Sequence, residues 1–455
     1  MTGNKAREHP YLPSTPDDRA AMLKTIGVSS VEELFADIPA AVRYKGPLEI
    51  PPALSEMDLL DHLQRLAAAN ADAGQYTSYL GGGVYDHYIP SVVDKLISRG
   101  EFATSYTPYQ AEISQGNLQA IYEFQTMICE LTGMDVANAS MYDGASATAE
   151  AALMAVNHTG RERIVIAQTV HPETRRVVKV YTETQNLQVE EVAWQEGAVA
   201  ADALASAVND QTACVILQVP NFFGVVENPA AVAELAHQAG AVLIAVCDPI
   251  SLGVLESPGA YGADIAVGEG QALGNAVSYG GPHFGFLAAR QKYLRRMPGR
   301  IVGATVDNEN REGYVLTLQT REQHIRRERA TSNICTNQAL MALAATVYMA
   351  TVGKQGFQEV ADLCLQKSHY LKEQLGEIER FEPAFPHQPF FKEFVIRSKL
   401  PVPDVLAELQ EQRILGGLAL APYYPDLADC FLVAVTEKRT RAELDHFVAR
   451  LEAIV

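Results

Sequence analysis

Short apolar runs alternate with helical segments from Met141 onward, and this alternation restricts the fold more than any other feature. Strands are predicted at residues 163–167, 188–193, 214–219 and 241–247, and helices at residues 149–157, 173–183 and 229–239. The run Ala241–Cys247 is apolar throughout, as expected of a central parallel strand that is covered on both faces. Strands separated by helices at these spacings predict an α/β fold with a large, doubly wound, mainly parallel sheet.

The segment Gly262–Phe286 indicates where a ligand would bind this sheet. A strand-like step at residues 265–267 leads into a glycine-punctuated loop, and ligands of such folds bind at the carboxyl ends of the strands. Many pyridoxal-phosphate enzymes have an aspartate and an apolar strand followed by a lysine, which holds the cofactor as a Schiff base. Here the position seven residues after Asp264 is Gln271, and a glutamine amide cannot form an imine. The chain therefore has the pattern of a cofactor enzyme without the covalent anchor.

Three further residues complete this predicted, degenerate cofactor pocket. Asp248 follows a predicted strand, where pyridoxal enzymes pair a carboxylate with the pyridine nitrogen. Ser146 lies at the start of an alanine-rich helix whose N–H groups suit a phosphate, although helix capping alone would explain the same residues. His171 lies at a turn that follows another strand. With Gln271, these residues define the expected pocket.

The chain is expected to divide into three parts. Residues 1–70 predict a helical arm with an amphipathic helix at about 58–70, which either wraps a partner subunit or caps the chain's own large domain. Residues 71–320 carry the large α/β domain. Residues 321–455 form a linking helix and a smaller α/β domain, and Thr440 begins a capping box for the last helix.

Three loops have an open interpretation. The triple glycine Gly81–Gly83 can either cradle a phosphate or form a surface turn. The aromatic and polar segment Phe102–Gln110 is typical either of a site lining or of buried packing. The charge run Arg321–Arg329 fits a solvated helix face as well as a functional role.

Composition excludes several classes of partner. The net charge is −19, whereas binding to nucleic acid or an anionic membrane needs clustered lysine and arginine. No apolar run approaches the roughly 18–20 residues that span a bilayer. The six cysteines are scattered without a C-x-x-C pair, so neither a metal site nor a disulfide framework is expected. A reducing cytoplasm fits this pattern best.

Five long motifs carry a resemblance to a known family. They are YLGGGVYDHYIP (79–90), SYTPYQAEISQGNLQAIYEFQTMICELTGMDVANASMYDGASA (105–147), DIAVGEGQALG (264–274), SYGGPHFGF (278–286) and REQHIRRERATSNICTNQAL (321–340). Together they resemble the glycine decarboxylase P-protein, and in particular its amino-terminal half, which some bacteria make as a separate alpha subunit. The similarity covers essentially the whole chain.

The resemblance implies the fold of type I pyridoxal-phosphate enzymes and an α2β2 assembly with a homologous beta subunit. In that assembly the beta subunit binds pyridoxal 5'-phosphate covalently, and this chain does not. The implied reaction is the decarboxylation of glycine, with transfer of the aminomethyl group to the lipoyl arm of the H-protein. The Gln271 position agrees with this division of roles.

The resemblance also implies which residues complete the partner's active site. Catalytic roles are expected for Tyr106, Tyr109, Gln110, His87 and Arg326, with Tyr85 beside them. Thr107, Thr331, Ser332 and Asn333 are expected to approach the partner's cofactor, and Arg326 to supply positive charge for a carboxylate.

Two alternatives remain open from the sequence. The chain could be a self-sufficient pyridoxal enzyme that uses another lysine, such as Lys292, although Gln271 argues against this. It could also be a structural partner that stabilises the beta subunit and adds nothing to the site. The Tyr106–Gln110 cluster argues for a role in the site, because a scaffold would not need it.

Overall fold

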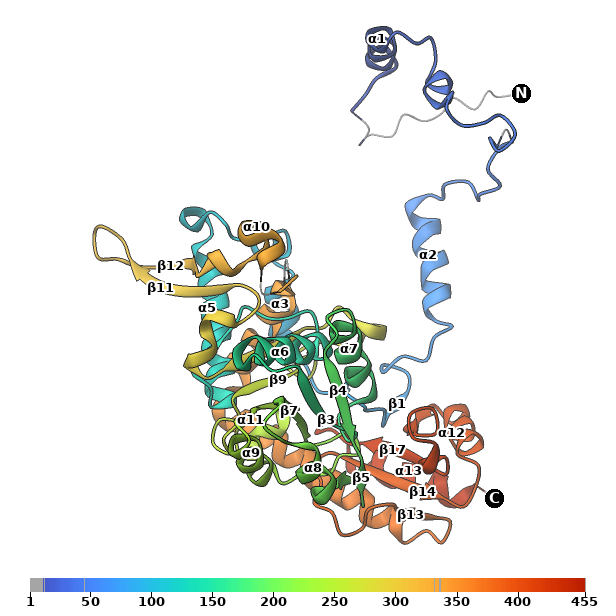
Figure 1. The fold of residues 1–455 in the computed structure, drawn as a ribbon. Helices are drawn as coiled ribbons and strands as arrows, with labels where there is room; N and C mark the ends of the chain where they lie inside the picture. Colours follow the sequence, from blue (N-terminus) through green and yellow to red (C-terminus); the bar gives the residue numbers. More distant parts are fainter. Residues whose placement is uncertain (1–10, 12, 45, 331, 335–336, 455) are drawn as a thin grey trace. The chain divides into compact units, whose positions relative to one another are not determined.

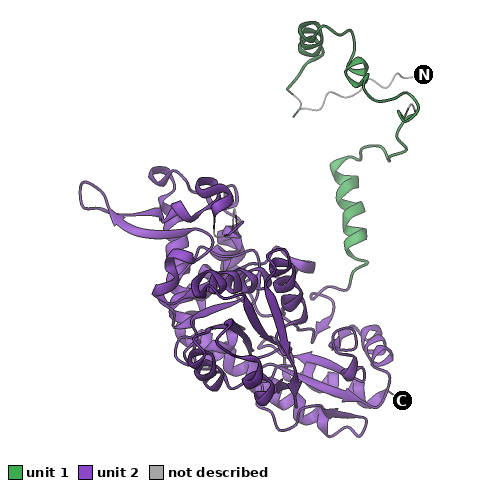
Figure 2. Cartoon of the chain, viewed as in Figure 1, with its two compact units in different colours: residues 1–70 green, residues 71–455 purple. Residues whose placement is uncertain are grey.

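The computed structural model describes all residues except 1–10, 12, 45, 331, 335, 336 and 455. The chain divides into two compact units, residues 1–70 and residues 71–455 (Figure 2). The predicted division at residue 320, inside the second unit, stays a prediction. No helix among the described residues is long and apolar enough to cross a membrane.

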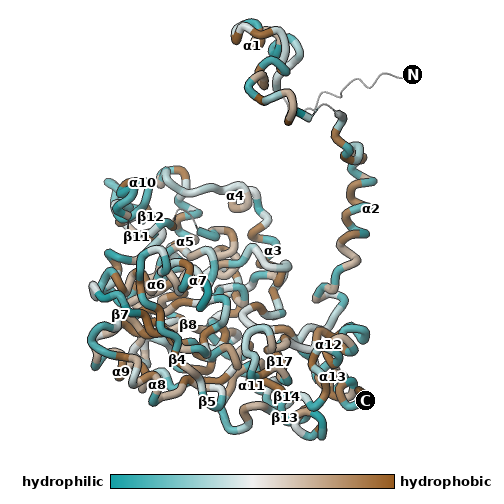
Figure 3. The backbone as a smooth tube through the Cα atoms, turned by 45° about the vertical axis from the view of Figure 1, so that its right-hand side comes forward, coloured by the Kyte–Doolittle hydropathy of each residue, from teal (hydrophilic) through white to brown (hydrophobic). Residues whose placement is uncertain are grey.

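In its described residues, the first unit consists of short helices without a core. It contains α1 (Pro16–Ile26), a 3-10 turn (Val31–Phe35) and α2 (Glu56–Ala67). Thr15 and Asp18 form a capping box at the start of α1. None of these elements has a buried residue, and four leucines of α2 are exposed. Hydrophobic positions recur along α2 in Figure 3. The apolar side of α2 is therefore without a partner in the described part of this unit.

A seven-stranded sheet forms the centre of the second unit (Figure 1). Its strands lie in the order β2-β10-β9-β8-β7-β3-β4, and the pairs from β9 to β4 are parallel. The strands are β2 (Val136–Ala137), β3 (Arg163–Ala167), β4 (Gln188–Val192), β7 (Thr212–Val219), β8 (Val242–Cys247), β9 (Ile265–Glu269) and β10 (Gly285–Ala289). All six residues of β8 are buried, so this strand is covered on both faces. The predicted parallel sheet is confirmed.

The helices of this unit up to residue 326 lie before, between and after these strands in the sequence. They are α3 (Ser91–Ile97), α4 (Gly100–Ala103), α5 (Gln115–Thr132), α6 (Gly144–Thr159), α7 (Pro172–Glu183), α8 (Ala201–Ala207), α9 (Pro229–Gln238) and α10 (Gln323–Arg326). The alanine-rich α6 contacts β7, β8, β9 and β10, because its small side chains allow a close approach to the sheet. It begins at Gly144, five residues before the predicted start, since a capping box from Asp143 extends it. Ser114 precedes α5, but its side chain makes no capping hydrogen bond.

The carboxyl-terminal part of the unit contains a second, antiparallel sheet. Its order is β13-β14-β17-β16, with β13 (Phe381–Pro383), β14 (Glu393–Ser398), β17 (Cys430–Ala434) and β16 (Leu418–Ala419). Helices α11 (Ala339–Gly376), α12 (Val402–Glu411) and α13 (Arg441–Ala453) accompany it, and α11 changes direction at Gly353, whose φ is 63°. The Thr440–Glu443 capping box of α13 is confirmed.

The remaining strands form three small pairs. They are β1 (Thr77–Ser78) with β15 (Ile414–Leu415), β5 (Trp194–Gln195) with β6 (Ala198–Val199), and the hairpin β11 (Ile301–Val306) with β12 (Glu312–Thr317). The β1–β15 pair joins the segment before the triple glycine to the carboxyl-terminal part of the unit.

Candidate functional site

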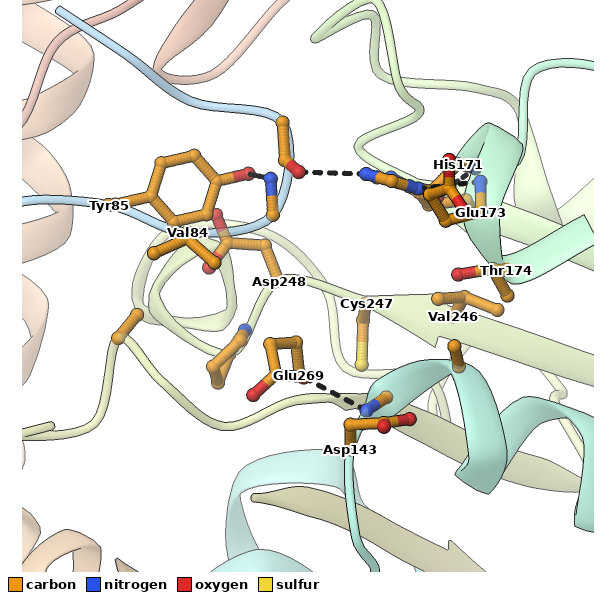
Figure 4. Close-up of a pocket in the computed structure, with 17 residues that line it drawn as sticks. Val84, Tyr85, Asp143, His171, Glu173, Thr174, Val246, Cys247, Asp248 and Glu269 are labelled. Carbon is orange, nitrogen blue, oxygen red and sulfur yellow. Dashed lines mark hydrogen bonds between the residues drawn. The ribbon is translucent and has the colours of Figure 1, made fainter. Parts of the chain in front are cut away.

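A cavity of about 230 Å³ lies where β8 and β9 end and α6 begins (Figure 4). It has the location at which ligands bind in open α/β sheets. The lining comes from segments that are far apart in the sequence. It includes Gly82, Gly83, Val84, Tyr85, Asp143, Gly144, His171, Glu173, Gln218, Asp248, Glu269 and Ala272.

Asp248, at the end of β8, forms a buried salt bridge with Lys392. The Lys392 Nζ lies 2.7 Å from the Asp248 carboxylate, and the lysine side chain is only 1% exposed. The other Asp248 oxygen accepts a hydrogen bond from the Ile250 N–H at 3.0 Å. Both carboxylate oxygens therefore have a partner within the chain.

Lys392 also connects Asp248 to the segment around His87. Its ammonium lies 3.0 Å from His87 Nε2 and 3.5 Å from the centre of the Tyr85 ring. His87 Nδ1 lies 2.6 Å from the Glu437 carboxylate. Burial and the nearby Lys392 ammonium lower the pKa of His87. A neutral imidazole then accepts from Lys392 through Nε2 and donates to Glu437 through Nδ1–H.

Glu437 ends this chain of contacts on the side of β17. Burial opposes its ionisation, but hydrogen bonds from His87 and from the Tyr88 N–H outweigh burial and lower its pKa to about 2. His87, Glu437 and Cys364 lie close enough to suggest a metal site. The Lys392 ammonium bound to His87 Nε2 opposes a cation there, so the cluster is explained by hydrogen bonds alone.

Gln271 is buried and uses its amide to hold the backbone of Tyr85. Its Oε1 accepts from the Tyr85 N–H at 2.8 Å, and its Nε2 donates to the Tyr85 carbonyl at 3.0 Å and to the Asn275 carbonyl at 2.8 Å. Only a side chain that both donates and accepts can satisfy these groups. Gln271 therefore anchors the segment that passes over the cavity.

Two N–H groups at the start of α6 donate hydrogen bonds to carboxyl groups of the chain itself. The Gly144 N–H donates to Glu269 at 3.0 Å, and the Ser146 N–H donates to Asp143 at 2.7 Å. The Ser146 hydroxyl takes part in the same capping box. Burial raises the pKa of Glu269 to about 8. The predicted role of Ser146 in helix capping is thus present, and its N–H is occupied.

His171 caps α7 and binds the glycine segment. Its Nδ1 accepts from the Glu173 N–H at 3.1 Å, so the ring proton is on Nε2, which donates to the Gly82 carbonyl at 2.8 Å. Burial lowers the pKa of His171, which favours this neutral form. The ring packs edge-on against Phe222.

The triple glycine wraps around the Glu393 carboxyl group. The Gly82 N–H and the Tyr85 hydroxyl donate to its two oxygens at 2.7 and 2.8 Å. A side chain at Gly81 would come within 2.2 Å of the same carboxyl group. Burial raises the pKa of Glu393 to about 7. The glycines therefore serve this internal contact, which neither of the two interpretations from the sequence included.

The residues of this pocket do not fit pyridoxal phosphate. Asp248 is paired with Lys392, the first N–H of α6 is bound to Glu269, and Gln271 offers no amine. Lys292, the alternative anchor, does not line the cavity and instead forms a 2.8 Å salt bridge with Asp264, which precedes β9.

The predicted Tyr106–Gln110 cluster lies on the surface, beside α10. Tyr106 is 85% exposed and Tyr109 is 52% exposed, whereas Thr107 is half-buried and Gln110 is exposed. The Tyr109 hydroxyl accepts from Arg300 at 3.1 Å, and its ring lies 6.2 Å from the His324 ring. The structure therefore brings this cluster together with the charge run.

The other predicted residues are distributed as follows. Arg326 and Asn333 are exposed. Ser332 is half-buried; its hydroxyl hydrogen bonds to Glu150 and lowers the pKa of that carboxyl, but burial dominates and raises it to about 7. Thr331 lies outside the described residues. Tyr85 contacts Gln271 and Glu393, and His87 contacts Glu437 and Lys392. The expected proximity of Tyr85 and His87 to residues 106–110 stays a prediction.

The sequence interpretation missed Lys392, Glu393, Glu269 and Glu437. One signal was available: Phe390-Phe391-Lys392-Glu393-Phe394 places two charged residues inside an apolar run. Charged side chains in such a run are buried with partners or are functional. Glu269 is the last residue of β9, and Glu437 lies three residues after the end of β17.

Comparisons with known proteins give a consistent result. The family described as glycine cleavage system P-protein matches residues 9–451. A relative from Carboxydothermus hydrogenoformans, named a probable glycine dehydrogenase (decarboxylating) subunit 1, is 55% identical over 439 residues, or 96% of this chain and 98% of the relative. A crystal structure of glycine decarboxylase (P-protein) of the glycine cleavage system, in inhibitor-bound form, has a TM-score of 0.89 and 43% identity, and the match covers 98% of this chain and 100% of that one.

A more distant structure shares the fold. It is a C-DES variant with glycine covalently linked to its PLP cofactor, with a TM-score of 0.62 and 17% identity over 84% of this chain and 100% of that one. The predicted type I fold of pyridoxal-phosphate enzymes is confirmed. The match over nearly the whole length shows that this chain belongs to the glycine cleavage system P-protein family.

Proposed function

We propose that this chain is the alpha subunit of a two-subunit glycine decarboxylase, in which a beta subunit holds pyridoxal 5'-phosphate. The name subunit 1, carried by the relatives, supports the existence of a second subunit. The observation that carries the proposal is the state of the chain's own pocket. Gln271 replaces the lysine of a cofactor enzyme, and Lys392 already pairs with Asp248.

The reaction of the assembled enzyme is an oxidative decarboxylation. The bond between the two carbons of glycine breaks, and the carboxyl carbon leaves as carbon dioxide. The remaining aminomethyl carbon forms a bond to one sulfur of the H-protein's lipoyl disulfide, while the other sulfur becomes a thiol. The disulfide thus accepts the two electrons of the broken bond. The cofactor in the beta subunit supplies the electron sink for this step.

This chain contributes a surface that completes the partner's site. Tyr106, Thr107, Tyr109 and Gln110 lie at that surface and approach glycine and the cofactor. The exposure of Tyr106 supports this role, since a large aromatic side chain at 85% exposure is typical of an interface residue. Arg326 supplies positive charge for a carboxylate, and Thr331, Ser332 and Asn333 approach the cofactor phosphate or the entry channel. A catalytic role for His87 stays a prediction.

The assembly is an α2β2 heterotetramer that docks the H-protein in the cytoplasm. The exposed leucines of α2 support a partner subunit, because an unpaired apolar helix face is stabilised by burial. The described cysteines are unpaired, which agrees with a reducing compartment.

The test is glycine–bicarbonate exchange in the complex reconstituted with the beta subunit. Tyr109→Phe removes a hydroxyl at the proposed site and should lower turnover at least tenfold without dissociating the complex. Tyr370→Phe is the matched control, because it removes a surface hydroxyl that is bound to Asp445 in the carboxyl-terminal part. Equal turnover in the two variants would favour the structural-partner alternative for this chain.

A further inference from the structure

In the type I fold, three polar places around the strand ends bind pyridoxal phosphate. A carboxylate at a strand end faces the pyridine nitrogen, helix N–H groups hold the phosphate, and a lysine holds the aldehyde carbon. In this chain the corresponding elements are the end of β8, the start of α6 and the residues after β9. Each position has an internal partner, and Figure 4 shows the one at the start of α6, where Glu269 binds Gly144.

At the end of β8, the Lys392 ammonium occupies the position that the pyridine nitrogen of the cofactor would take. It lies 2.7 Å from Asp248, the distance of a charge-assisted hydrogen bond. A protonated pyridine would have to displace this ammonium from a site where the lysine is 1% exposed. The displaced charge would also lose its contacts with His87 and the Tyr85 ring.

At the start of α6, the Glu269 carboxyl group occupies the position that the phosphate of the cofactor would take. It accepts from the Gly144 N–H at 3.0 Å and from the Gln271 N–H at 3.3 Å. A phosphate there would have to displace Glu269 and would face the Asp143 carboxylate that caps the helix. Both effects oppose an anion at this helix end.

After β9, the Gln271 amide holds the segment that covers the cavity. Its two hydrogen bonds to the Tyr85 backbone fix residues 82–85, which also bind His171 and Glu393. This segment lines the cavity from the side opposite α6 (Figure 4).

We propose that three side chains occupy the polar positions that a cofactor would need, so that the pocket excludes pyridoxal phosphate and instead fixes residues 82–88. The three side chains are Lys392, Glu269 and Gln271. This inference rests on the proposed function, in which the beta subunit holds the cofactor. The inference adds that the missing lysine is only one of three features that prevent this chain from binding the cofactor. Restoring a lysine at position 271 alone leaves the pocket closed.

The experiment uses the full chain, incubated with pyridoxal 5'-phosphate, reduced with borohydride and mapped by peptide mass spectrometry. The wild type and Gln271→Lys should give only background labelling of the peptide that contains position 271. The triple variant Gln271→Lys, Glu269→Ser, Lys392→Met should give at least ten times the adduct of Gln271→Lys alone. Replacing Glu269→Ser by Glu269→Gln in the triple variant is the matched control, because an amide oxygen still occupies the Gly144 N–H. This control should stay near the level of the single variant.

Each outcome has a distinct meaning. Equal labelling of Gln271→Lys and the triple variant, or no labelling of a folded triple variant, would overturn the inference and leave the proposed function intact. A labelled lysine in the wild-type pocket would overturn both. If the triple variant does not fold, retention of pyridoxal phosphate by the double variant Glu269→Ser, Lys392→Met on a desalting column decides the question. Retention above the wild-type level supports the inference, and equal retention overturns it.

Discussion

Lys392→Met tests the buried ion pair at the centre of the pocket. Methionine keeps most of the side-chain volume, so the change mainly removes the charge and its hydrogen bonds. The Asp248 carboxylate, whose side chain is 12% exposed, is left without its cation. Removing one partner of a buried salt bridge costs about 3–5 kcal/mol. We expect a loss of this size in the free energy of unfolding.

The double variant Lys392→Met, Asp248→Asn separates the ion pair from other effects of the substitution. Because it removes both charges, it should recover about 2–3 kcal/mol relative to the sum of the single variants. Urea unfolding can be followed by the fluorescence of Trp194, the single tryptophan, which packs against Phe223, Phe385 and Tyr424. The free-energy change follows from the shift in the midpoint at an unchanged slope.

Lys438→Met provides the control for this measurement. Lys438 also lies 2.7 Å from an aspartate, Asp86, but its side chain is 36% exposed and Arg439 binds the same carboxylate. Loss of such a pair should cost less than about 1 kcal/mol. If Lys392→Met costs no more than Lys438→Met, or if the double variant equals the sum of the single variants, the proposed coupling through Lys392 is refuted.

Three further predictions concern pH and assembly. The lowered pKa of Glu437, about 2, means that its stabilising contribution is present above pH 4.5 and is lost as the pH falls towards 2; Glu437→Gln should remove this acid-dependent step of about 3 kcal/mol from a series of thermal melts. The raised pKa of Glu269, about 8, has the opposite effect: its contribution to stability is present below pH 4.5 and is lost as the pH rises through 8. The melting temperature of Glu269→Gln should therefore lie close to that of the wild type at pH 5 and above that of the wild type at pH 9. Leu60→Asp with Leu63→Asp in α2 should weaken association with the beta subunit at least tenfold in sedimentation experiments, whereas the polar-face change Gln64→Asp should not; equal association would exclude α2 from the interface.

The sheet was predictable because its signals are local. Each parallel strand is a short apolar run, and the intervening helices have clear ends, so the strand at residues 163–167 was predicted to the residue. The location of Asp248 at the end of β8 follows from the same pattern, since a polar residue directly after a buried strand marks the carboxyl edge of the sheet.

The contents of the pocket were not predictable in the same way. Lys392 lies far from Asp248 in the sequence, directly before β14 of the second sheet, and only the tertiary structure brings the two together. The surroundings of His87 and Tyr109 were not predictable for a related reason. A motif read along the chain gives no information on whether a side chain faces the surface or the interior. His87 faces Glu437 and Lys392 inside, while Tyr109 faces Arg300 and α10 outside.

Under the proposed function, in which the beta subunit holds the cofactor, the polar groups of this chain's own pocket need internal partners. A carboxylate at the end of β8 and N–H groups at the start of α6 are partly or fully removed from water, and each would cost about 1–3 kcal/mol or more without a partner. A change of lysine to glutamine at position 271 removes the covalent bond but does not satisfy these groups. Lys392 and Glu269 satisfy them, and the Gln271 amide adds two hydrogen bonds to the segment above the cavity. Each of the three residues therefore satisfies a different polar group, which is why a lysine at position 271 alone should fail to reopen the pocket.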